Sequence, residues 1–169
     1  MKSRLALLVA GLCLLTGCAP TPPLQQTIKA GSSAEFQQWR ANSADTLAAG
    51  QWRWFDIAIQ ELKLGVMRAG KISGSVAIEA SVREHIHGRP LGDVLREGLQ
   101  AYLERKTAER HDTETTIATN DQRIKPLIKP GADDILRDFN AHQEMLREKL
   151  PRLDSDIAEA RAALANFGL

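Results

Sequence analysis

The chain has 169 residues, of which 43% are hydrophobic and 25% charged, a composition typical of one globular domain or one elongated helical element. Only 5% of the residues are aromatic, so the core has to be mostly aliphatic. The 22 basic and 21 acidic side chains nearly cancel and form no long run of one sign, which argues against nucleic acid as a partner.

The N-terminal segment has the pattern of an export signal. Lys2 and Arg4 are followed by an apolar run of eleven residues, 5–15. This run is too short to span a bilayer, which needs about 20 apolar residues in a helix, but it has the length of the hydrophobic region of a signal peptide. Charged residues interrupt every later apolar stretch. We therefore expect no membrane-spanning helix in the mature protein.

The apolar run ends in the four residues Leu15-Thr16-Gly17-Cys18. They resemble the lipobox of bacterial lipoproteins, in which an aliphatic residue and two small residues precede a cysteine. The resemblance implies that residues 1–17 are a lipoprotein signal peptide and that a peptidase cuts between Gly17 and Cys18. It also implies that Cys18 carries an S-diacylglyceryl group and an N-acyl group. The alternatives are an ordinary signal peptide with an incidental cysteine and a buried N-terminal helix.

Lipidation of Cys18 would determine several properties of the mature protein. Cys13 leaves with the signal peptide, so no cysteine remains for a disulfide and the fold has to depend on packing alone. Loss of Lys2 and Arg4 leaves 20 basic and 21 acidic side chains, a formal charge of −1. Two or more acyl chains make a stable anchor in the membrane, whereas one chain is marginal. Ala19 rather than aspartate follows the cysteine, which in the enterobacterial sorting rule implies the outer membrane of the cell envelope, with the protein facing the periplasm.

Residues 18–31 comprise the lipidated cysteine and a predicted flexible tether. Three prolines favour extended backbone, and the segment has no apolar periodicity. At about 3 Å per residue, it could hold a folded body up to about 40 Å from the lipid. The alternative is that Leu24 and Ile28 pack on that body.

Residues 32–88 are predicted to form a helical N-terminal part. Ser32 and Glu35 have the spacing of a capping box, which predicts that a helix begins near Ser33. A second helix is expected over about 51–69, because apolar residues recur there at spacings of three and four.

A third helix is expected before Gly88, with Ser73 or Ser75 as its cap. The first two helices carry most of the aromatic residues, which we interpret as core. A hydrophobic groove for a partner helix or a lipid is the alternative. These residues are Trp39, Trp52, Trp54 and Phe55.

Residues 89–169 are predicted to form a long antiparallel helical hairpin, coiled-coil-like, so that the expected fold class is all-α. Pro90 suits the first turn of the first helix. Its apolar stripe then thins, and four threonines between residues 113 and 119 favour fraying or a break. Two prolines and a glycine in residues 125–131 predict the turn. Polar residues occupy expected core positions, namely Lys106, Arg110, Thr113 and Asn120.

The second helix of the hairpin, over residues 132–167, has a sustained heptad pattern. We favour one kinked helix over two separate helices, because the heptad register survives Pro151. The simplest partner for its seam is the preceding helix, and another protein or a second copy of this chain is left open. The seam positions are Leu136, Gln143, Leu150, Ile157 and Leu164, with Phe139, Leu146, Leu153, Ala160 and Phe167.

No catalytic, cofactor or metal site is predicted. His85 and His87 would lie on opposite sides of a helix, and no second pair of ligands has the spacing of a zinc site. Asp154, Asp156 and Glu159 lack the glycine and the terminal glutamate of a calcium loop, so we interpret them as a solvated helix face. The sequence also contains no GxSxG, glycine-rich phosphate loop or CxxC.

Two short patches resemble a family of small helical bacterial lipoproteins of unknown function. Residues 28–36, IKAGSSAEF, are similar to the helix start that follows the tether in that family, and residues 87–95, HGRPLGDVL, are similar to the entry into its long charged helix. Pro90 departs from the family pattern, which has a hydroxyl residue at that position. The resemblance implies an architecture but no activity.

The sequence therefore predicts an envelope protein anchored through lipid at Cys18, which acts as a periplasm-facing helical scaffold or interaction module. A module that binds a lipid or a hydrophobic small ligand between the helices bearing Trp39, Trp52 and Phe55 is the alternative. An enzyme ranks third, because no catalytic constellation is present in the sequence.

Overall fold

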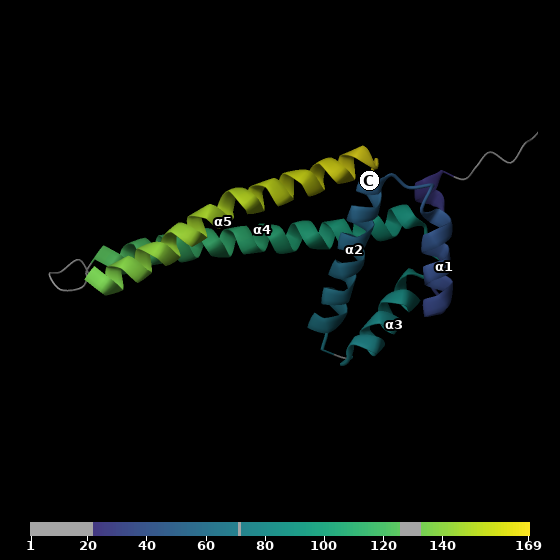
Figure 1. Cartoon of the computed structure of the whole chain (residues 1–169), viewed down its shortest axis with the longest axis horizontal. Helices are drawn as coiled ribbons and strands as arrows, with labels where there is room; N and C mark the ends of the chain where they lie inside the picture. The colour runs from purple at the N-terminus through teal and green to yellow at the C-terminus, as the bar shows by residue number, and fades with distance from the viewer. Residues whose placement is uncertain (1–21, 71, 126–132) are drawn as a thin grey trace, which may run out of the picture.

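The computed structural model describes residues 22–70, 72–125 and 133–169, and confirms the all-α fold class (Figure 1). A short 3-10 turn, η1 (Pro23–Gln25), precedes five α-helices. These are α1 (Ser33–Ser43), α2 (Ala49–Arg68), α3 (Ser75–Ile86), α4 (Leu91–Ile124) and α5 (Asp133–Asn166). Over the described ranges the only β pairing is an isolated bridge between Thr27 and Pro90.

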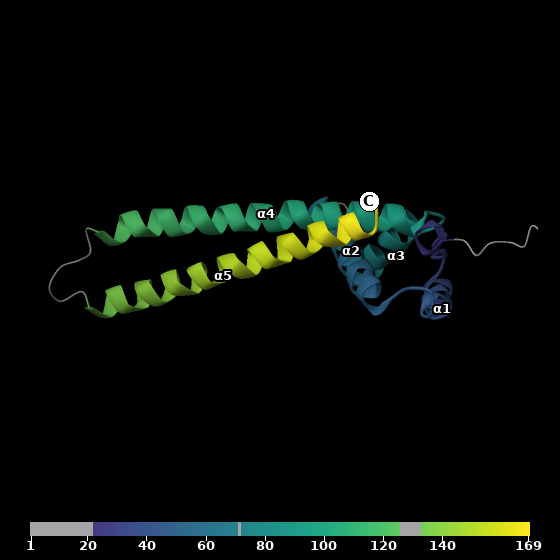
Figure 2. The same ribbon diagram turned by 90° about the horizontal axis from the view of Figure 1, so that it is seen from above.

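The long helices α4 and α5 form the predicted antiparallel hairpin (Figures 1 and 2). Each has 34 residues, which corresponds to about 51 Å at 1.5 Å per residue. Helices α1, α2 and α3 are gathered at one end of this hairpin, with α2 packed across α4. We call this end the base and the opposite end the tip; the C-terminus lies at the base.

The first helix begins as predicted. The Ser32 hydroxyl accepts a hydrogen bond from the backbone N–H of Glu35 at 3.1 Å. In a capping box the Glu35 carboxylate would accept a hydrogen bond from the backbone N–H of the cap residue, Ser32. Here it accepts instead from the N–H of the preceding residue, Gly31, at 2.8 Å.

The predicted serine cap of the third helix is wrong. Gly74 holds the capping position with φ +92°, a left-handed conformation that glycine adopts without a steric penalty, and no side chain caps the helix.

The second half of the predicted tether is part of the folded body. Ile28 is fully buried, and its N–H donates to Arg89 O at 2.9 Å while its carbonyl accepts from Gly88 N at 2.9 Å. Leu91 N donates to Gln26 O at 2.9 Å. Residues 24–31 therefore do not form an extended tether; they follow the alternative in which Leu24 and Ile28 pack on the body.

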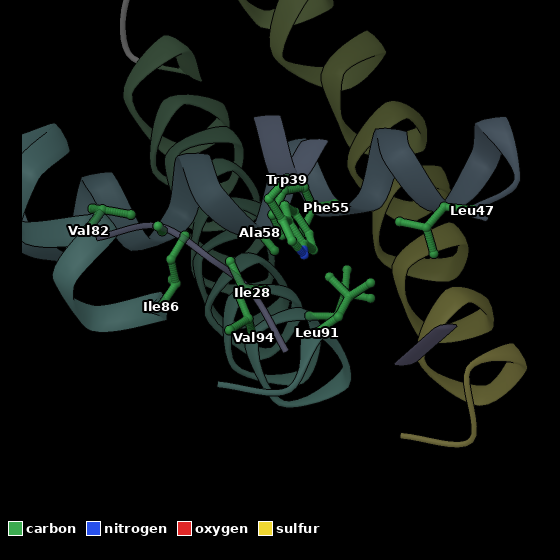
Figure 3. Close-up of a cluster of buried hydrophobic side chains, with 11 residues drawn as sticks. Ile28, Trp39, Leu47, Phe55, Ala58, Val82, Ile86, Leu91 and Val94 are labelled. Atoms are coloured by element: carbon green, nitrogen blue, oxygen red, sulfur yellow. The ribbon is translucent and has the colours of Figure 1, made fainter. Parts of the chain in front are cut away.

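The hydrophobic core lies at the base, where α1, α2, α3 and the start of α4 meet (Figure 3). Helices α2 and α4 cross in close contact at Gly98, which has no side chain; a Cβ at this position would overlap the backbone of Ala58. Side chains from all four helices and from the segment before α1 fill this core. Its largest fully buried members are Phe55, Ile28, Ile86, Leu91, Leu95, Leu99 and Val94.

Helix α4 runs unbroken through its threonines, so the predicted fraying or break is wrong. Thr113 is buried, and its hydroxyl donates to the Glu109 carbonyl at 2.7 Å. The polar residues at core positions are paired with α5: Lys106 with Asp156 at 2.7 Å, and the Asn120 amide with Gln143 at 3.1 Å. Packing of α5 along the whole helix overrides the weak local propensity of the threonines.

Helix α5 is continuous through Pro151, which confirms one helix rather than two. Pro151 is exposed, so the hydrogen bond that it removes faces solvent. All ten residues predicted along the seam are buried or half-buried; nine lie in α5, and Phe167 follows its last residue. The predicted turn at 125–131 lies outside the described residues except for Lys125.

Candidate functional site

The predicted lipidation and cleavage residues, Cys18 and Gly17, lie outside the described residues. The described chain begins at residue 22, and its first element, η1, sits at the base against the start of α4. Leu24 and Leu169 both lie against Gly92 there, so residues 22–31, which we call the N-terminal segment, share one end of the molecule with the C-terminus. The Ala30 N–H donates to His87 Nδ1 at 2.9 Å and fixes the segment further.

The hairpin tip is at the opposite end of α4 from this N-terminal segment (Figure 2). Because α4 starts at the base and runs about 51 Å to the tip, the long axis of the molecule separates the two. A residue near the tip is therefore separated from the N-terminal segment by about the length of α4.

The aromatic residues pack on one another, as the core interpretation predicted. Trp39 and Phe55 are buried, with ring centroids 5.6 Å apart, and the Trp52 ring meets each edge-on at 6.1 and 5.6 Å. The Arg40 guanidinium lies 5.2 Å from the centroid of Trp52, a cation–π distance. The rings thus fill the space between them, where the ligand-binding alternative placed its cavity. Trp54 is half-buried on the other side of α2 and meets Tyr102 edge-on.

A pocket of about 300 Å³ does open beside this cluster, between α1, α2 and α3. Each helix contributes four residues spaced i, i+3, i+4 and i+7, starting at Ser33, Asp56 and Glu79, which is one face of each helix. We call it the three-helix pocket. Its floor is apolar, and consists of Phe36, Ile59, Val82 and Ile86.

The rim of the three-helix pocket is charged, with one basic side chain from each helix. Arg40 pairs with Asp56 at 2.8 Å and Lys63 with Glu79 at 3.2 Å. Over the described ranges, Arg83 forms no hydrogen bond or ion pair with another side chain. Sequence reasoning did not find this pocket, although on α1 and α2 a basic residue follows an apolar floor residue by one helical turn.

A chain of charged groups ties α2 to the hairpin. Glu61, 4% exposed, accepts a hydrogen bond from Arg105 Nε–H that is shared between its two carboxylate oxygens at 3.0 Å, and a second from Arg105 Nη2. The hydrogen bond to Glu61 raises the pKa of Arg105, although burial opposes it. One turn further along α4, Glu109 lies 3.7 Å from Arg105 and also accepts a hydrogen bond from Lys149 of α5 at 2.7 Å. The hydrogen bond from Lys149 lowers the pKa of Glu109, against the effect of burial. These contacts join α2 to both helices of the hairpin.

The residues considered for metal binding have other contacts. His85 lies 2.9 Å from Glu97, and His87 accepts from Ala30. Asp154, Asp156 and Glu159 each pair with a basic residue, Arg110, Lys106 and Arg53 respectively. Within residues 22–70, 72–125 and 133–169, no three acidic or histidine side chains are grouped as metal ligands. In the same ranges no helix has the length and apolarity needed to cross a membrane.

The chain matches no known protein family, and no curated protein or solved structure is detectably similar to it.

Proposed function

We propose that this protein is a lipid-anchored component of the bacterial cell envelope that holds its helical hairpin in the periplasm as a scaffold or interaction module. One observation carries the proposal. The lipobox-like residues at 15–18 directly precede a body whose first described element lies at the base, at the far end from the hairpin tip. Ala19 favours the outer membrane as the site of the anchor.

The docked segment limits how far the body could move from the lipid. Only three residues lie between Cys18 and Pro22, and the four Cα-to-Cα steps from one to the other span at most about 14 Å when fully extended. The base would stay close to the membrane surface, and the hairpin would present its distal part about 50 Å farther out.

The distal half of the hairpin is the surface that we assign to a partner. Its seam side chains, such as Leu136, Phe139 and Leu146, are only half-buried, because a single neighbouring helix cannot cover an apolar stripe completely. A protein partner or a second copy of this chain would bury more of them.

The anchor is tested by membrane fractionation with mass spectrometry of the mature N-terminus, comparing wild type with Cys18→Ala. We expect acyl groups on Cys18 and membrane retention in wild type, and loss of both in the variant. An unmodified wild-type N-terminus would remove the main support for the proposal.

The partner surface is tested with single cysteines, which are clean probes because the mature chain would have no free thiol. Met145→Cys lies on the distal half of α5 and is exposed. Gln37→Cys, exposed on α1 at the base, is the matched control. Crosslinking in cells at position 145 but not at 37 would support partner binding by the hairpin, and equal crosslinking at both would argue against it.

A further inference from the structure

We propose that the three-helix pocket binds a small monovalent anionic amphiphile, a carboxylate with an acyl chain of about eight carbons. This binding function goes beyond the scaffold role and does not depend on it. It follows from the size of the pocket, its apolar floor and the charge of its rim.

The volume sets the size of the ligand. One water takes up about 30 Å³ of liquid, so the 300 Å³ of the pocket corresponds to about ten non-hydrogen atoms. That is the size of an eight-carbon carboxylate, and it lies at the lower limit of small-molecule sites. A whole phospholipid is several times too large.

The floor selects an apolar chain. Phe36 of α1 and Ile59 of α2 are half-buried, so they expose apolar surface to the pocket. Val82 and Ile86 of α3 also line it, but they belong to the buried core cluster (Figure 3). A polar group placed on this floor would lose its hydrogen bonds to water without replacement. An acyl chain would instead remove apolar surface from water.

The rim selects a negatively charged head group. Three basic side chains face two acidic ones, which leaves one positive charge in excess. Arg40 and Lys63 already have carboxylate partners, so Arg83 is the rim cation that forms no ion pair with another described residue. A guanidinium binds a carboxylate through two parallel hydrogen bonds, which makes Arg83 the expected contact for the head group.

The two existing ion pairs leave the rim able to adapt. Asp56 and Glu79 are each more than half exposed, at 56% and 53%. Ion pairs this exposed add little to stability, so their side chains can move aside when a ligand enters.

The test uses the full chain in nanodiscs of phosphatidylcholine, with octanoate as the probe and isoleucine methyl NMR signals as the readout. Ile59 and Ile86 report on the pocket, and the exposed Ile135 on the distal hairpin is the internal control. We expect saturable shifts of Ile59 and Ile86 without a shift of Ile135. Arg83→Gln should weaken binding at least tenfold, and octanol, which has the same chain without the charge, should bind at least tenfold more weakly than octanoate.

Arg137→Gln is the matched control, since it removes an exposed arginine on α5 far from the pocket. If Arg83→Gln loses helical circular dichroism, Gln60→Trp decides instead, because an indole at this exposed lining position would fill the pocket and abolish the shifts. Equal affinity for octanol and octanoate, or equal binding by the two arginine variants, would overturn the proposal. So would shifts of Ile59 and Ile86 caused by phosphatidylglycerol nanodiscs without octanoate.

Discussion

Glu61 and Arg105 form a buried, bidentate ion pair between α2 and α4, with Arg105 Nε 3.0 Å from both carboxylate oxygens. The two partners differ in burial, because the side chain of Glu61 is 3% exposed and that of Arg105 is 29% exposed. The free energy of unfolding should therefore fall by different amounts when Arg105 or Glu61 is removed.

Arg105→Met should destabilise the protein more than Glu61→Gln. The first leaves a carboxylate buried without its partner, which costs about 3–5 kcal/mol, whereas the second leaves a guanidinium that can still reach water. Urea denaturation followed by circular dichroism measures both. The double variant Glu61→Leu with Arg105→Met should regain most of the loss, because an apolar pair replaces the ion pair. Equal losses in the two single variants would contradict this account.

Acid should weaken the fold partly through Glu109. Its pKa is lower in the folded protein, because Lys149 donates a hydrogen bond to its carboxylate. Such a group stabilises the fold above its unfolded pKa, and the contribution disappears as the pH falls through the folded value. We expect the urea midpoint to fall as the pH drops below about 5, and Lys149→Met to reduce that dependence. An unchanged pH dependence in Lys149→Met would exclude this contribution, with Arg137→Met as the control for loss of a surface charge.

Gly98→Ala should destabilise the protein by about 1–3 kcal/mol, because its methyl group would overlap Ala58 and force α2 and α4 apart. Gly65→Ala, inside α2 with open space around it, is the matched control. It should stabilise the protein by about 0.5–1 kcal/mol, as alanine does in a helix interior. Thermal denaturation of both variants checks the expected opposite signs, and the same sign for both would show that the helices do not cross at this point.

Ile28→Ala should cost about 2–5 kcal/mol, because the side chain is fully buried in the core. Gln25→Ala, at an exposed position three residues earlier, should change stability by less than about 0.5 kcal/mol. A flexible tether would make both changes silent, so urea midpoints for the pair distinguish a docked segment from a free one.

Features with a local origin could be predicted from the sequence. The start of α1 at Ser33 depends on Ser32 and Glu35, which lie within one helical turn of it. The seam of α5 depends on a heptad repeat, which places its apolar residues on one side of a helix, so the spacing alone predicts the seam positions. The lipobox-like motif at Cys18 is likewise read from four consecutive residues.

Only the tertiary structure decided the features that join distant parts of the chain. Ile28 is held by Gly88 and Arg89, about 60 residues away, and nothing in the proline-rich segment around it signals this contact. The threonines of α4 stay helical because α5 lies beside them, which local propensity cannot show.

The three-helix pocket also depends on contacts between distant parts of the chain, since three separate helices bring Arg40, Lys63 and Arg83 to one rim. The sequence by itself thus determined the helices, their seam and the lipobox-like pattern at residues 15–18, because each depends on short-range spacing along the chain. The docking of residues 24–31, the continuity of α4 and the pocket depended on packing between helices, which no short-range pattern encodes.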